Sequence, residues 1–143
     1  MTRSIVAQAA QAIGAAEAIH SMATDYSKQR VQFGKPIGSF QAIQHLCAEM
    51  LQQLELGRAG LHYALWVLDA GDLREAHRAA VMCKAYPAET FPQIAANAIQ
   101  IFGGVGFTWE YDIQLFYKRL LSLQMTWGNS EVWLEELATL VID

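Results

Sequence analysis

Apolar residues recur at intervals of three and four along most of the chain, and this spacing predicts helices. The first such stretch runs from about Ser4 to Gln32, and its repeating positions are mostly alanine and isoleucine. A second begins at Ser39, a residue type favoured at helix N-caps, and continues to about Ala70. Glycines inside it, Gly57 and Gly60, suggest close contact with another helix. No stretch alternates as a β-strand does.

The third apolar stretch opens with Asp72 as its cap and reaches Phe102. Pro87 and Pro92 lie inside it. A proline within a helix removes a hydrogen-bond donor and clashes with the preceding turn. We therefore expect a kink or a break near Tyr86.

Two shorter helices are predicted after a tight turn at 103–106. They span about Trp109–Leu123 and Ser130–Val141. The fold class that follows is all-α, an up-and-down helical bundle of three long helices plus two shorter C-terminal ones. The length of 143 residues suits one domain, which we place over 1–143.

Composition narrows the range of functions. The chain is 53% hydrophobic and 17% charged, which excludes a disordered protein. Its net charge of −4, without a basic cluster, argues against a nucleic acid or an anionic membrane surface as partner. The high apolar content predicts self-association, as a dimer or tetramer.

The sequence gives no sign of a targeting segment, a membrane span or a metal-binding pair of cysteines. No basic and apolar leader and no membrane-spanning run is visible. Cys47 and Cys83 lack metal-type spacing, so we interpret them as reduced, buried thiols. A cytoplasmic location is expected.

One motif, YSKQRVQFGKPIGSFQ, occupies Tyr26–Gln41. A guanidinium at a helix end beside an aromatic side chain, here Arg30 and Phe33, can hold a phosphate and stack on a ring. The spacing alone favours a simpler alternative, in which Arg30 is merely exposed and Phe33 packs the turn.

A second motif, QIFGGVGF, occupies 100–107. It lacks G-x-G-x-x-G and follows a helix, so it is not a Rossmann loop. Gly104 would let the backbone approach a ligand closely. The alternative is a helix C-cap with a left-handed glycine, and both can hold together.

In composition, order and separation, the two motifs resemble the hallmarks of the acyl-CoA dehydrogenase family, one of which is R-x-[QT]-F-G-x-x-I-x-x-F-Q. The resemblance covers the whole chain and corresponds to the C-terminal helical domain. It implies that Arg30 reaches the pyrophosphate, and Phe33 the adenine, of an FAD held by an adjacent subunit. The implied cofactor-binding residues are Arg30, Gln32, Phe33, Ile37, Phe40, Gln41, Gln100, Gly103 and Gly104.

The catalytic base of the family is not matched. The family uses a glutamate to remove a proton α to a thioester carbonyl while a hydride passes to the flavin. An ungapped match places Trp127 on that glutamate, and the alternative position on the first helix holds Ser4. Glu131, about one helical turn or ~6 Å further on, is a weak candidate for a substitute base.

The resemblance implies α,β-dehydrogenation of an acyl-CoA thioester with FAD, in fatty acid metabolism. The N-terminal helical and middle β-domains supply most of that site in the family, so this chain alone is expected to be inactive. A second hypothesis is a non-catalytic subunit that lends Arg30, Phe33, Gln100 and Gly104 to the flavin of a partner dehydrogenase. A third is a structural bundle without a ligand.

Other chemistry is less well supported. Glu17 and His20 form one E-x-x-H unit of the kind found in di-iron bundles, which need two. His45 and Glu49 do not complete the set. Lys118 matches a family arginine, but a solvated helix face is the favoured interpretation. No nucleophile motif is present.

Overall fold

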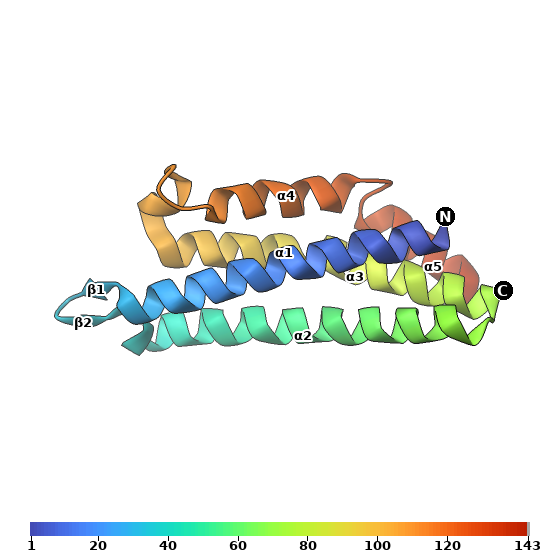
Figure 1. Cartoon of the computed structure of the whole chain (residues 1–143), viewed down its shortest axis with the longest axis horizontal. Helices are drawn as coiled ribbons and strands as arrows, with labels where there is room; N and C mark the ends of the chain where they lie inside the picture. Colours follow the sequence, from blue (N-terminus) through green and yellow to red (C-terminus); the bar gives the residue numbers. More distant parts are fainter. Residues whose placement is uncertain (143) are drawn as a thin grey trace.

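A computed structural model describes residues 1–142. Its helices are α1 (Thr2–Gln29), α2 (Gln41–Ala70), α3 (Leu73–Phe102), α4 (Ile113–Met125) and α5 (Ser130–Ile142). The three long helices form one elongated bundle in which α2 runs antiparallel to α1 and α3, and α4 packs across α1 and α3 (Figure 1). The predicted all-α bundle of three long and two shorter helices is confirmed.

The first helix ends at Gln29, three residues before the predicted end. Arg30 has the extended angles φ −72° and ψ 120°, and a small hairpin of β1 (Val31–Gln32) and β2 (Lys35–Pro36) follows. The expectation of no strand was therefore wrong here. A two-residue strand is too short to show alternation in the sequence.

The prediction of Ser39 as an N-cap was also wrong. Ser39 closes a 3₁₀ turn, η1 (Ile37–Ser39), and its hydroxyl donates to the carbonyl of Pro36 at 2.7 Å. Phe40 occupies the cap position, and α2 begins at Gln41. The serine hydroxyl satisfies a local carbonyl instead of a helix N–H, which is a common competing use of this side chain.

Helix α3 is continuous through both prolines, so the predicted break near Tyr86 is absent from it. Pro87 is buried in the face that packs on the neighbouring helices. Burial of that face outweighs the cost of an internal proline, about 3 kcal/mol. The predicted cap is confirmed, because the Asp72 carboxylate accepts the N–H groups of Arg74 and Glu75 at 3.0 and 3.1 Å.

The glycine-rich segment is a 3₁₀ helix, η2 (Gly103–Phe107), and not a tight turn. Helix α4 starts at Ile113, four residues later than predicted. Trp109 belongs to the loop before it and is 85% exposed. The predicted start of α4 was too early because Trp109 was assigned to the apolar face of the helix.

The long helices approach closely at Gly57. A Cβ atom at that position would lie 2.6 Å from Cζ of Phe91 on α3. A Cβ atom at Gly60 would meet no atom within 4 Å, so within residues 1–142 only one of the two predicted close contacts occurs. Phe91, Ile94 and Leu54 are fully buried around this crossing.

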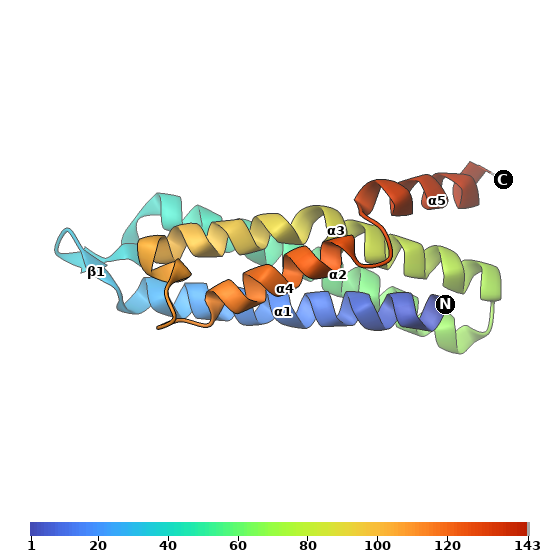
Figure 2. The same ribbon diagram turned by 90° about the horizontal axis from the view of Figure 1, so that it is seen from above.

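Helix α5 projects along the end of the bundle opposite the hairpin (Figure 2). It packs on α3 through buried Trp133, whose indole N–H donates to the carbonyl of Gly128 at 3.1 Å. His77 Nε2 lies 2.7 Å from Glu136 Oε1 across the same contact. Among residues 1–142, no helix is long and apolar enough to cross a membrane.

Candidate functional site

The end of α1 and the end of α3 meet beside the hairpin, which extends beyond the bundle (Figure 1). An open groove of about 370 Å³ lies between them. It is lined by Tyr26, Arg30, Gln32, Ile37, Ile101, Phe102, Gly104, Val105 and Thr108. Two segments about 70 residues apart thus form one surface, and both predicted motifs contribute to it.

The backbone at Arg30 is held on both sides. Its N–H donates to the carbonyl of Tyr26 at 2.8 Å, and its own carbonyl accepts from the N–H of Ile37 at 2.8 Å. The side chain is exposed, and no ion pair neutralises it within residues 1–142. A fixed backbone with a free guanidinium is suited to binding an anion.

The hairpin tip is strained. Phe33 and Gly34 form the two-residue loop with φ of 54° and 78°, the pattern of a type I′ turn. A phenylalanine rarely adopts positive φ, and this ring is also 91% exposed. It meets Phe40 edge to face, with centroids 6.1 Å apart, while the Lys35 ammonium lies 4.3 Å from the Phe40 ring centroid. A planar base and a phosphate group would both find complementary surfaces here.

Two glycines follow α3. Gly103 has φ 67° and ψ −147°, a region open essentially to glycine alone, and its N–H caps the helix at the carbonyl of Ile99. It is therefore a cap with positive φ, though outside the left-handed helical region that the sequence suggested. A Cβ at Gly104 would meet no atom within 4 Å, so its backbone is open to the groove.

The structure brings four of the nine predicted cofactor residues into the groove: Arg30, Gln32, Ile37 and Gly104. The other five lie outside its lining. Phe33 is in the hairpin loop, Phe40 precedes α2 and Gln41 begins it. Exposed Gln100 lies in the last turn of α3, and exposed Gly103 directly follows that helix.

Sequence reasoning missed the groove residues Tyr26 and Phe102. Their rings stack and join the two motifs. The available signal was an aromatic residue within each motif, four residues before Arg30 and two before Gly104.

The two base positions lie far from the groove. Ser4 is exposed in the first turns of α1, whereas Arg30 follows its last residue. At 1.5 Å per residue these positions are separated by roughly 39 Å. Trp127 is 57% exposed in the α4–α5 turn with φ 64°, and Glu131 is exposed in the first turn of α5.

The E-x-x-H residues are engaged elsewhere. Glu17 Oε1 pairs with Arg58 at 2.9 Å, and His20 Nε2 lies 3.1 Å from the carbonyl of Cys47. Across residues 1–142, no group of three or more His, Cys, Asp or Glu side chains is placed to hold a metal ion.

The described residues thus form a long helical bundle with an arginine hairpin beside a glycine-rich helix end. The model for the acyl-CoA dehydrogenase C-terminal domain matches residues 2–141, and the chain therefore belongs to the acyl-CoA dehydrogenase family.

Curated relatives agree with this family. Acyl-CoA dehydrogenase IpdE2 of Mycolicibacterium smegmatis is 38% identical over 111 residues, which are 78% of this chain and 33% of the relative. The short-chain-specific acyl-CoA dehydrogenase of Megasphaera elsdenii is 36% identical over 126 residues, 88% of this chain and 32% of the relative. The chain thus spans about a third of the length of these proteins.

The fold agrees as well. The structure of butyryl-CoA dehydrogenase from Megasphaera elsdenii superimposes with a TM-score of 0.92 at 33% identity. The match covers 97% of this chain and 36% of that one. The helical architecture is therefore a feature of the family domain.

Proposed function

We propose that this chain is the C-terminal domain of an FAD-dependent dehydrogenase that oxidises an acyl-CoA thioester between its α and β carbons. The groove between the hairpin and the end of α3 carries the proposal, because it combines a free cation, an amide side chain and open glycine backbone. FAD, when bound, supplies the hydride acceptor.

The residues around the groove fit the ADP half of FAD. Arg30 is free to pair with the pyrophosphate, and the Gly104 backbone is open to close approach. The exposed ring of Phe33 offers a face for the adenine. Gln41 and Gln100 lie outside the groove lining and would offer amide groups to ribose or phosphate oxygens that extend beyond it. A volume of about 370 Å³ suits part of a dinucleotide better than all of it.

An adjacent subunit is the expected source of the rest of the flavin site. The groove lies roughly 39 Å from Ser4 along α1, too far for one flavin to serve the groove and that base position. The exposed ring of Phe33 would also be buried by contact with another subunit. Both features favour an oligomer, either a homodimer or homotetramer or a hetero-oligomer with a flavin-bearing dehydrogenase subunit.

The alternative is a non-catalytic assembly subunit that completes the FAD site of such a partner. It is favoured by the residues at the base positions. The Trp127 indole and the Ser4 hydroxyl cannot act as a carboxylate base. In this case the groove keeps its function while the acyl-CoA is oxidised elsewhere.

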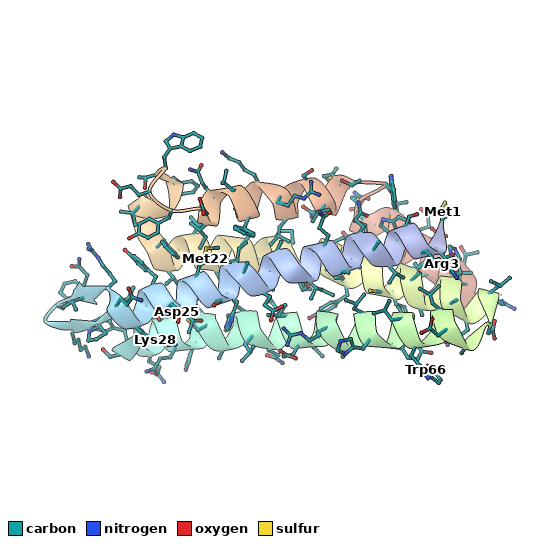
Figure 3. All side chains as sticks on the ribbon, in the orientation of Figure 1. Met1, Arg3, Met22, Asp25, Lys28 and Trp66 are labelled. Carbon is teal, nitrogen blue, oxygen red and sulfur yellow. The ribbon has the colours of Figure 1, made fainter. Side chains whose placement is uncertain are left out.

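Flavin retention tests the groove. Arg30→Ala in the native assembly should weaken FAD binding by at least about tenfold, because a charged hydrogen bond contributes about 1.5–3 kcal/mol. Arg3→Ala is the matched control, since Arg3 lies at the opposite end of α1 from Lys28 and the hairpin (Figure 3). Equal flavin content in both variants would contradict the proposal.

Glu131→Gln separates the two functions. If the chain is catalytic and Glu131 is its base, turnover of the native assembly should fall by about 10²-fold or more, with flavin content unchanged. An unaltered rate would favour the assembly subunit.

A further inference from the structure

Lys84 is a buried cation on α3. It is 3% exposed, and its Nζ donates to the carbonyl oxygen of Leu123 on α4 at 2.5 Å. No carboxylate pairs with it within residues 1–142. Burial lowers the pKa of its ammonium to about 8. A methionine would fill similar space without this desolvation cost, so the burial of a charged group here needs a compensating polar interaction.

A small cavity of about 10 Å³ adjoins this ammonium. Its polar lining residues are Gln8 on α1, Lys84 on α3 and Gln124 on α4, and its other lining residues have apolar side chains. The side-chain oxygen of Gln8 is buried and has no hydrogen-bond partner among the described residues. The space is about that of one water molecule, and the ammonium has donors left to bind it.

The Leu123 carbonyl lies where α4 stops. The last carbonyls of a helix have no intrahelical partner and form the negative end of its dipole. Within five residues the backbone passes through positive φ twice, at Trp127 with 64° and at Gly128 with 114°. The ammonium therefore binds the chain four residues before a turn in which Trp127, a non-glycine residue, has positive φ.

We propose that Lys84, with one water molecule shared with Gln8, forms an internal polar centre that positions the α4–α5 turn carrying Trp127. Lys84 acts through the Leu123 carbonyl and is a positioning residue. The centre joins α1, α3 and α4 and lies away from the flavin groove, so it goes beyond the proposed function and does not depend on it.

Fluorine NMR of the full chain labelled with 5-fluorotryptophan tests this inference. The Trp127 signal is assigned by its loss in Trp127→Phe. In Lys84→Met that signal should shift or broaden, while the Trp66 signal from α2 keeps its position. Lys118→Met is the matched control on α4, because its ammonium lies 6.0 Å from the Trp109 ring and should affect that signal instead.

The pH dependence gives a second readout that needs no variant. Among the residues that the structure describes, Lys84 is the only titratable one that lines the cavity. The Trp127 signal of the unaltered protein should therefore move with a midpoint near 8, and Lys84→Met should abolish the movement. If the signal has the same position and the same pH profile with and without Lys84, the proposal is wrong. If Lys84→Met does not fold, a Trp127 signal that is flat through this pH range in the unaltered protein would overturn it equally.

Discussion

The rings of Tyr26 and Phe102 stack nearly in parallel, with centroids 4.2 Å apart and an interplanar angle of 14°. Tyr26 lies in the last turn of α1, and Phe102 is the last residue of α3. The edge of Tyr111 packs against both rings, at 5.6 and 5.0 Å between centroids. This cluster fixes the distance between the arginine hairpin and the glycine segment, so the groove depends on it.

Phe102→Ala should therefore weaken both the fold and the groove. Loss of a buried phenylalanine costs about 3–5 kcal/mol, measured by urea unfolding. Phe107→Ala is the control, because Phe107 is 65% exposed and should change stability by less than about 0.5 kcal/mol. Similar losses in both variants would contradict the role of the stack.

Gly57 and Gly60 should respond in opposite directions to alanine. Gly57→Ala forces a Cβ atom against Phe91 and should cost about 1–3 kcal/mol. Gly60 is in the same helix, but a Cβ atom there would meet no atom within 4 Å. Gly60→Ala should therefore raise the free energy of unfolding by about 0.5–1 kcal/mol. Thermal unfolding of the two variants measures the difference, and a gain at both sites would refute the close contact.

Trp127→Gly should relieve backbone strain. Positive φ outside glycine costs of order 1 kcal/mol or more, partly offset by the greater freedom of glycine in the unfolded chain. The expected net gain is up to about 1 kcal/mol in the free energy of unfolding. Trp109→Gly, at an exposed position without positive φ, should give no gain. A loss at Trp127 would show that its ring makes contacts worth more than the strain.

Stability should depend on pH through Lys84. Its pKa is about 8 in the folded protein and 10.5 as the ordinary value, so between these pH values the unfolded chain binds more protons. Stability then rises with pH across this window, by roughly 2–3 kcal/mol from this group. Lys84→Met should lack the rise, and the difference between the two proteins isolates it from other titrations. A constant difference across the window would exclude the shift.

The two cysteines should differ in reactivity. Burial raises the pKa of the Cys83 thiol to about 12, which keeps it protonated and inert. Cys47 is only half-buried and lines an open groove between α1 and α2. Alkylation with iodoacetamide at mildly alkaline pH, followed by mass spectrometry, should modify Cys47 first. Equal labelling of folded Cys83 would show that α3 opens readily.

Sequence periodicity located all five helices. Helices α1 to α4 bury residues over several turns, whereas α5 buries Trp133 and packs Leu137 and Leu140 partly against the same cluster. Periodicity misplaced features that depend on single contacts. The Ser39 hydroxyl donates to the carbonyl of Pro36 instead of accepting a hydrogen bond from a helix N–H. Pro87 lies inside a continuous α3 because the packing energy of the surrounding buried residues exceeds the energetic cost of a proline within a helix.

The candidate site was predicted in part. Motif spacing selected Arg30 and Gly104, which the fold brings to one groove. It did not reveal the stack of Tyr26 on Phe102, because the pattern of one segment contains no information on its distant partner. The sequence also did not predict the burial of Lys84 or the cavity beside it, because a lysine in an alanine-rich helix is usually exposed to solvent.

The hairpin beyond the bundle has all four of its strand residues exposed and Phe33 bare at its tip. Such a loop is an accessible substrate for proteases while it stands alone. Nicking at this point would cut the chain between α1 and α2, yet the helices on either side remain packed together. In the proposed oligomer a partner would cover this loop, and the rate of cleavage at the hairpin would then measure the unassembled fraction of the protein.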